Sequence, residues 1–449
     1  MKSHNQSSTH SQITALVAAA LCIAATAGAQ QIVTNLPMPI YAGNIALNPA
    51  LNKIYLAGGN PAAQQMLVVD GDTFSQVGVG TGGSVAVDVV NNNYWSAGVY
   101  SGTATVWDSN DVAVMNISLG FCPTGVDVDA PHRRAWAVAQ CGSFNDPVWA
   151  IDSDTYALIA GPIGSGGVMG QTMVNPATDR FYLNSGGSKR VNPFTFALTA
   201  NAFGVVIGAN AQANLLYAQG PGGVLQILDG APDPEVVLTD VTLPSPLPGA
   251  RIGVNPKLNR IYVQNMNAIL ILDGTTGATI GTVDLGAAVT SVGNIVVDAS
   301  RNRVYAFAYG VSAYLYVIQD IAPACPVGQG FWKNNPNAWP VSSLTLGSQT
   351  YAETELLTIL KTPVGSGTKA DASLILADQL IAAKLNVANG ADAASPSSAI
   401  PDADAVLSGF AGKLPYKIKS SSASGQAMTS NATVLNSYNS GLLTRGCLP

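Results

Sequence analysis

The chain has 449 residues, of which 47% are hydrophobic and only 10% are charged, against about 25% charged in an ordinary soluble domain. Residues 30–324 carry 11 basic and 19 acidic side chains, a net charge of −8, whereas residues 325–449 carry 8 and 7, a net charge of +1. Neither balance offers the clustered basic surface that nucleic-acid binding requires. We therefore expect no nucleic-acid partner.

The N-terminus has the pattern of a secretory signal peptide. Lys2 and a polar run precede the apolar stretch Ile13–Thr26, and Ala27–Ala29 is a small-x-small cleavage site. We expect residues 1–29 to be removed, and the mature chain to begin at Gln30 as a secreted, periplasmic or cell-surface protein. No later stretch is long and apolar enough for a transmembrane helix.

A repeated unit follows, and Ile252–Gly286 is its clearest copy. Short runs rich in β-branched and aromatic residues alternate there with Asn, Asp, Gly and Pro, which predicts antiparallel strands joined by tight turns. Four strands are predicted in this copy: Ile252–Asn255, Arg260–Gln264, Ala268–Leu272 and Ala278–Leu285.

The repeat has a measurable phase, because an Asn or Asp precedes an aromatic residue by seven positions in each unit. The pairs are Asn48–Tyr55, Asp88–Trp95, Asp129–Trp136, Asn175–Tyr182, Asn210–Tyr217, Asn255–Tyr262 and Asp298–Tyr305. The first members are 35 to 46 residues apart, and four strands at roughly this period are typical of β-propeller blades. We predict a mainly β fold, a seven-bladed β-propeller of four-stranded antiparallel blades over residues 30–324.

The two ends of the repeat predict how the ring closes. The seventh unit contains only three strands before Pro323, whereas Gln31–Pro37 has the pattern of a fourth strand without a blade of its own. We expect this N-terminal strand to complete the seventh blade, since closure removes open edge strands.

The motif IYVQN at Ile261–Asn265, followed by ILD at Ile271–Asp273, resembles the YVTN-repeat propellers of bacterial and archaeal cell-surface proteins. Looser copies are IYLAG, FYLNS and VYAFA. The resemblance covers about two thirds of the chain and implies a secreted or surface-bound propeller.

The periodicity changes after Ala324, where a mainly helical module is predicted over residues 325–449. The expected helices are Ala352–Leu360, Asp371–Val387, Asp402–Phe410 and Ala427–Tyr438, with Lys419–Ser424 as a flexible link. GFWKNNPNAWP (Gly330–Pro340) and LIAAKLNVANG (Leu380–Gly390) resemble a small α module at the ends of bacterial extracellular proteins that opens with GYWKNHPxAWP. Phe331 and Asn335 replace the Tyr and His of that opening.

Four cysteines remain beyond the signal segment, an even number in an oxidising compartment. Cys122 and Cys141 flank a predicted hairpin at equal distances from its turn, and Cys325 and Cys447 bracket the C-terminal module. We predict two structural disulfides with these pairings.

Catalytic, cofactor and metal sites are not predicted. His132 is the one histidine after residue 10 and lies in a predicted turn, whereas acid–base catalysis and transition-metal sites mostly use histidine. Two further in-register sets are interpreted as structural. The first is a series of turn aspartates at Asp70, Asp108, Asp152, Asp229, Asp273 and Asp320, and the second is a series of basic residues at Lys53, Arg134, Arg180, Arg260 and Arg303.

Ligand-binding candidates are polar and aromatic residues of the loops expected at the channel mouth, and two tryptophans of the C-terminal module. They are Tyr100, Asn145, Lys189, Arg190, Asn265, Asn267, Tyr309, Trp332 and Trp339. For the two tryptophans the favoured explanation is that they form the core of the module.

Three functions remain open. The favoured one is a non-enzymatic exported propeller that binds a protein or a polysaccharide of the cell envelope, with the C-terminal module as an attachment or second binding unit. A lactonase- or lyase-type propeller enzyme is the first alternative, for which Glu235 is the only glutamate of the propeller. A structural surface-layer subunit is the second.

Overall fold

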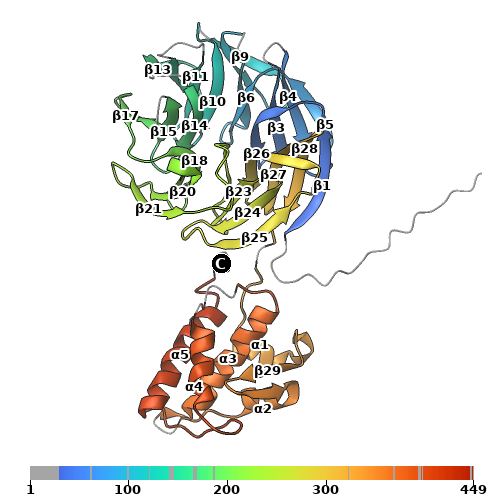
Figure 1. Cartoon of the computed structure of the whole chain (residues 1–449), viewed down its shortest axis with the longest axis vertical. Helices are drawn as coiled ribbons and strands as arrows, with labels where there is room; N and C mark the ends of the chain where they lie inside the picture. Colours follow the sequence, from blue (N-terminus) through green and yellow to red (C-terminus); the bar gives the residue numbers. More distant parts are fainter. Residues whose placement is uncertain are drawn as a thin grey trace, which may run out of the picture.

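The structure, a computed structural model, describes residues 30–60, 63–98, 101–120, 122–140, 146–164, 169–185, 188–321, 323–367, 370–392, 396, 398–444 and 447. Figure 1 shows a ring of sheets and a separate, smaller helical unit formed by the C-terminal part of the chain. The ring consists of seven four-stranded antiparallel sheets. The fold is a seven-bladed β-propeller, as the repeat predicts.

The first four blades follow one another along the chain. They are β2 (Ala42–Asn48), β3 (Lys53–Asn60), β4 (Ala63–Asp70), β5 (Gln76–Gly80); β6 (Ser84–Asp88), β7 (Asn93–Ala97), β8 (Thr103–Trp107), β9 (Ala113–Ser118); β10 (Pro123–Asp129), β11 (Arg134–Ala139), β12 (Pro147–Asp152), β13 (Leu158–Gly164); and β14 (Met169–Asn175), β15 (Arg180–Ser185), β16 (Ser188–Val191), β17 (Leu198–Ala200).

The remaining three blades complete the ring. They are β18 (Val205–Asn210), β19 (Leu215–Gln219), β20 (Leu225–Asp229), β21 (Val236–Val241), with the short η1 (Pro221–Gly223) between β19 and β20; β22 (Gly253–Asn255), β23 (Arg260–Asn265), β24 (Ala268–Asp273), β25 (Thr279–Asp284); and β26 (Val289–Asp298), β27 (Arg303–Gly310), β28 (Ala313–Gln319) with β1 (Gln31–Met38). The first strand of each blade is innermost and the last lies at the outer edge.

The N-terminal strand closes the ring as expected. β1 pairs antiparallel with β28, from Gln31 opposite Gln319 to Met38 opposite Ala313. The first and last strands of the propeller are therefore held in one blade, so the ring cannot open without breaking this ladder.

The Asn or Asp that marks each repeat organises the turn after the innermost strand. At six of the seven positions its side-chain oxygen accepts backbone N–H groups two or three residues further on, as Asn48 Oδ1 does from Ala50 and Leu51. The fourth residue after each of the seven has a positive φ of 50–55°: Asn52, Asn92, Arg133, Asp179, Asn214, Asn259 and Asn302. Short polar side chains tolerate this left-handed conformation best, which explains why five of these residues are Asn.

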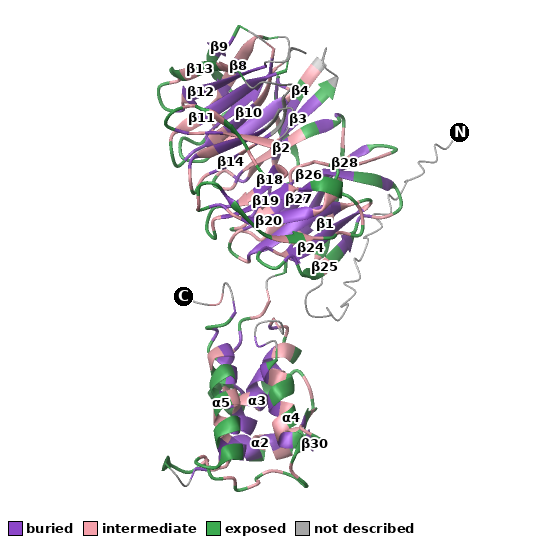
Figure 2. Cartoon of the chain, turned by 60° about the vertical axis from the view of Figure 1, so that its left-hand side comes forward, coloured by how far each residue is buried: buried purple, intermediate pink, exposed green. Residues whose placement is uncertain are grey.

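The aromatic residue seven positions later is buried in every blade. Seven hydrophobic clusters fill the ring, and each combines residues of two neighbouring blades. Figure 2 shows this burial concentrated on the inner and middle strands, with exposure at the outer strands and turns. Each blade thus depends on both neighbours for its core, as the stacked units of a repeat protein do.

The C-terminal unit is built around one almost fully buried helix. Its elements are α1 (Gln329–Asn334), η2 (Pro336–Ala338), β29 (Ser343–Leu346), β30 (Gln349–Ala352), α2 (Glu353–Lys361), α3 (Ala372–Ala388), α4 (Ala399–Ser408) and α5 (Ala423–Asn439). The helix α3 packs against the other four helices. Its N-cap is Asp371, whose side chain accepts the Ser373 N–H at 3.0 Å.

Two local expectations for this unit differ from the structure. The segment expected as a flexible link at Lys419–Ser424 contains the start of α5, because the Ser422 hydroxyl caps that helix by accepting the Gly425 N–H at 3.1 Å. The hairpin β29–β30 was not predicted; its four-residue strands are too short for a clear alternation. No helix in the described ranges is long and apolar enough to cross a membrane.

Candidate binding site in the central channel

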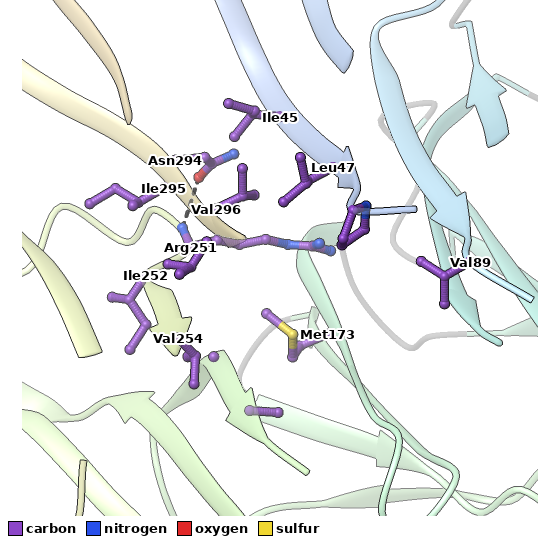
Figure 3. A pocket seen from close by; sticks show the side chains of 14 residues that line it. Ile45, Leu47, Val89, Met173, Arg251, Ile252, Val254, Asn294, Ile295 and Val296 are labelled. Atoms are coloured by element: carbon purple, nitrogen blue, oxygen red, sulfur yellow. Dashed lines mark hydrogen bonds between the residues drawn. The ribbon is translucent and has the colours of Figure 1, made fainter. Parts of the chain in front are cut away.

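The innermost strands surround a channel that contains a cavity of about 310 Å³. Its walls are mostly aliphatic, with residues from six of the seven blades (Figure 3). The lining residues are Ile45, Leu47, Pro49, Val89, Met173, Gly208, Ala209, Arg251, Ile252, Val254, Asn294, Ile295, Val296 and Val297. Such a cavity, apolar with few polar groups, is typical of small-molecule sites.

Arg251 is the one charged residue in this lining, and its side chain extends across the channel (Figure 3). Nη2 donates to Asp127 Oδ2 at 2.8 Å in blade three and to the Thr172 carbonyl at 2.6 Å in blade four. The Arg251 backbone N–H donates to Asn294 Oδ1 at 2.8 Å. Blade six is thereby connected to blades three, four and seven through a single residue.

Asp127 is buried, and burial raises the pKa of its carboxyl, while Arg251 opposes that rise. Within the described residues, Nη2 donates all the hydrogen bonds of the Arg251 guanidinium. Nη1 and Nε therefore remain able to bind a carbonyl or carboxylate group in the channel.

Neither Arg251 nor Asp127 was among the predicted site residues, although the repeat contains a signal for Asp127. Two positions before the repeat Asn or Asp, on the innermost strand, the other blades have Ala46, Ala86, Met173, Gly208, Gly253 and Val296. A carboxylate at this otherwise apolar or small position indicates a partner across the channel. Nothing in the sequence identifies that partner as Arg251, because it lies 124 residues away.

The predicted ligand-binding residues do not form one site. Tyr100 and Asn145 lie outside the described residues. Lys189 and Arg190 lie on β16 in blade four. Arg190 forms ion pairs with Asp233 and with Glu235, the latter at 2.8 Å.

The side chain of Glu235, the only glutamate of the propeller, is 1% exposed and has a structural role. Its carboxylate accepts from Arg180 Nη1 at 2.9 Å, from Arg190 Nη1 at 2.8 Å and from the Tyr182 hydroxyl at 2.6 Å. These contacts connect blade four to blade five.

Asn265 is the last residue of β23, and Asn267 lies in the turn that precedes β24. Asn265 Oδ1 accepts from the Ser245 hydroxyl at 2.7 Å, and Asn267 Nδ2 donates to Asp284 at 3.1 Å. Both amides are thus used in connecting loops of blades five and six.

Tyr309 lies near the end of β27, in the blade that closes the ring. Its hydroxyl donates to the Ala42 carbonyl at 2.6 Å. Its ring lies nearly parallel to that of Tyr41, with centroids 6.2 Å apart, and Tyr41 is 59% exposed. Tyr309 was among the predicted ligand-binding residues, whereas Tyr41, which belongs to the link between β1 and β2, was not. The pair forms an aromatic surface on which a sugar ring or a peptide side chain could stack.

Trp332 and Trp339 belong to the core region of the helical unit. Trp332 is buried, and its Nε1 donates to Asn386 Oδ1 at 3.0 Å; Trp339 Nε1 donates to the Trp332 carbonyl at 2.9 Å. The structural alternative therefore explains both residues.

One of the two expected disulfides is present between described residues, joining Cys325 to Cys447 with Cα atoms 5.3 Å apart. Cys141 lies outside the described residues, so the second pairing stays a prediction. The strand register is compatible with it, since the Gln140 N–H donates to the Cys122 carbonyl at 3.2 Å.

The in-register basic residues connect neighbouring blades rather than their own turns. Arg260 Nη1 contacts Asp320 Oδ1 at 2.5 Å, Arg303 donates to the Gly71 carbonyl, and Lys53 contacts Asp111.

Five of the turn aspartates cap backbone N–H groups as expected: Asp70, Asp108, Asp152, Asp229 and Asp273. Asp320 differs, because β1 replaces the strand that would follow it, and it accepts from Arg260 and Tyr262.

Groups able to ligate a metal come together at one place in the described part of the chain. Asp129, His132 and Asp179 bring one ligand atom each to within 4.8 Å of one another, where blade three meets blade four. Burial and the neighbouring Asp129 raise the pKa of Asp179 to about 6, although Arg134 opposes the rise.

The outer strands of the blades expose a second kind of surface. Large apolar side chains face solvent along them: Val77 and Val79 on β5, Val114 and Met115 on β9, Leu158 and Ile159 on β13, Val236, Val237 and Leu238 on β21, and Ile280 on β25. None of the seven outer strands contains Lys or Arg, and two contain one Asp each. Natural edge strands usually prevent unwanted pairing with such charges.

No family model matches the sequence, and no curated protein is similar to it. Among solved structures, the chain is similar to the β-propeller domain of Cps50 (Swd1) from Myceliophteria thermophila, with a TM-score of 0.52 and 11% identity. The alignment covers 65% of this chain and 99% of that one. At this identity the similarity establishes the propeller fold alone.

Proposed function

We propose that the protein is an exported, non-catalytic binding module whose propeller holds a protein partner along its outer strands. The observation that carries this proposal is the set of exposed valine, leucine and isoleucine side chains on the outer strands of separate blades, strands that contain no Lys or Arg. An extended segment of a partner would pair with an open edge and cover these side chains, the mode known as β-augmentation. Large exposed apolar surfaces generally mark interaction sites.

Export and family membership are parts of the same proposal. The N-terminal Lys2, the apolar run of residues 13–26 and the small residues Ala27–Ala29 support a cleaved signal peptide. The IYVQN motif supports a YVTN-type propeller, and GFWKNNPNAWP supports a C-terminal module of the GYWKNHPxAWP type. In this arrangement the disulfide-closed helical unit serves as the attachment or second binding unit in the cell envelope.

The test compares retention of the full chain by envelope material of the producing cell. We expect Val79→Lys with Val114→Lys to reduce retention at least about tenfold, because a buried lysine costs more than 1.4 kcal/mol at an apolar interface. The control is Val311→Lys, since Val311 is 95% exposed but lies in the β27–β28 turn. Equal retention of wild type and the double variant would refute docking at the outer strands. Concentration-dependent assembly of the purified chain, abolished by the same lysines, would favour the surface-layer alternative.

A second binding function, toward polysaccharide, is favoured by the exposed ring of Tyr41 against Tyr309. Aromatic rings present an apolar face that suits the apolar face of a sugar. Tyr41→Ala should abolish glycan binding on a broad glycan array while the outer-strand lysine variants bind normally. No glycan binding by the wild-type chain would remove this function.

A further inference from the structure

Four of the seven junctions between neighbouring blades share one side-chain pairing, and one of the other three brings two carboxylates together. The repeat Asn or Asp of one blade faces the positive-φ residue of the next. At four junctions two asparagines meet there: Asn48 with Asn92, Asn175 with Asn214, Asn210 with Asn259, and Asn255 with Asn302, at 3.1–3.5 Å. Between blades three and four the same positions are Asp129 and Asp179. Two carboxylates replace two amides, so no side-chain N–H is available between them.

Asp129 also does not cap the backbone of its turn, as the repeat Asn or Asp does in the other six blades. The second residue after it is Pro131, the one proline at that position of the repeat, and proline has no N–H to donate. Asp129 is fully buried, and His132 Nδ1 lies 3.1 Å from both of its carboxylate oxygens. Oδ1 nevertheless accepts no hydrogen bond of good geometry, and a buried carboxylate oxygen without a hydrogen bond is costly.

Asp179 presents the same feature from blade four. Its Oδ2 contacts Arg134 Nη1 at 2.5 Å, whereas its Oδ1 is buried without a hydrogen-bond partner. The local charge is therefore two carboxylates against one guanidinium. A cation between the two Oδ1 atoms would satisfy both oxygens and supply the missing positive charge.

His132, the third group of this cluster, indicates which class of cation the site would bind. His132 brings an imidazole nitrogen to within 4.8 Å of both carboxylates, and its side chain is 40% exposed. Imidazole together with carboxylate oxygens suits Zn²⁺ and related first-row divalent ions, whereas Ca²⁺ takes oxygen ligands only. The exposed side of the imidazole also provides an entry path and room for a water ligand.

We propose that Asp129, His132 and Asp179 form a Zn²⁺-class divalent metal site that joins blade three to blade four. The site takes the place of the amide pair that joins other blades. It is distinct from the channel cavity and from the outer strands, and it does not depend on the proposed binding function.

The experiment is isothermal titration of the full chain, carrying His4→Ala and His10→Ala, with Zn²⁺ and separately with Ca²⁺. In this chain His132 is the only histidine. We expect one Zn²⁺ per chain, at least about tenfold weaker binding in Asp129→Asn and in His132→Ala, and weaker binding of Ca²⁺. Thermal unfolding should shift upward with Zn²⁺ in the parent chain and not in these variants.

Asp129→Asn restores the residue found at four other blades, so the variant should fold. Its matched control is Asp88→Asn, the same change at the same repeat position in blade two, which should leave Zn²⁺ binding unchanged. The proposal is overturned by the absence of saturable Zn²⁺ binding, by equal binding in Asp129→Asn and the parent chain, or by tight binding of Ca²⁺ without Zn²⁺.

Discussion

The contact of Glu235 with two arginines is the clearest place to test how the blades are held together. The change is Glu235→Gln, which keeps the size of the side chain and removes its charge. In the wild type one carboxylate, 1% exposed, accepts from Arg180, Arg190 and the Tyr182 hydroxyl. In the variant the amide can accept through one oxygen only, and its NH₂ group points donors toward guanidiniums.

Removal of one partner from a buried ion pair typically costs about 3–5 kcal/mol, because the remaining charge stays buried without compensation. The guanidiniums are mostly buried here, and Arg190 retains its contact with Asp233. We therefore expect the free energy of unfolding of the propeller to fall by about 3–4 kcal/mol. The measurement is urea denaturation of the full chain, followed by near-ultraviolet circular dichroism.

The matched control is Asp233→Asn, which removes a carboxylate from the same two arginines. Asp233 is 55% exposed, and exposed pairs contribute about 0–1 kcal/mol. A loss below about 1 kcal/mol for Glu235→Gln, or a loss equal to that of Asp233→Asn, would refute the assignment of Glu235 as the buried connection between blades four and five.

Three further predictions concern stability. Burial raises the pKa of Asp378 from 3.8 to about 7, with Lys333 opposing, so the folded state binds a proton that the unfolded state has lost between about pH 4 and 7. The free energy of unfolding of the helical unit should therefore fall as the pH rises through this window, which urea denaturation at each pH would measure. Asp378→Asn should remove this pH dependence and raise the free energy of unfolding at pH 8 by about 2–4 kcal/mol. An unchanged pH dependence in the variant would contradict the assignment. Replacing Cys325 and Cys447 by Ala opens a loop with a sequence separation of 122 residues and should cost the helical unit about 4–5 kcal/mol, with an unchanged urea midpoint as the contrary result. Deleting Gln30–Met38 exposes the edge of β28 and should increase self-association relative to the intact chain, measured by light scattering; unchanged scattering and unchanged stability would show that β1 is dispensable.

The repeat pattern made the propeller predictable because its determinants are local. A capping Asn or Asp, a left-handed residue four positions later and a buried aromatic three positions after that specify a hairpin within eight residues, as in Asn255–Tyr262. Ring closure by the N-terminal strand could likewise be predicted by counting strands along the sequence, because a fourth strand is missing before Pro323 and an extra strand begins at Gln31. The main helices were also predicted, because their apolar periodicity is visible along the chain.

Contacts across the ring were not predictable in this way. Arg251 and Asp127 are 124 residues apart, Tyr41 meets Tyr309 only after closure, and Glu235 acquires two arginines from another blade. The β-hairpin β29–β30 of the helical unit and the true start of α5 were not predicted, because short strands and serine-rich caps carry little periodicity.

The amino-acid sequence by itself determined the number of blades, the turn chemistry, the closing strand and the position of the helical unit, since each follows from residues close together in the chain. The tertiary structure alone decided which charged groups meet. Asp129 and Asp179 are unremarkable turn residues in their own hairpins, and they become a pair of buried, partly unsatisfied carboxylates only when blade four packs against blade three. Electrostatic partners act across space, and their identity depends on how the units of a repeat are stacked.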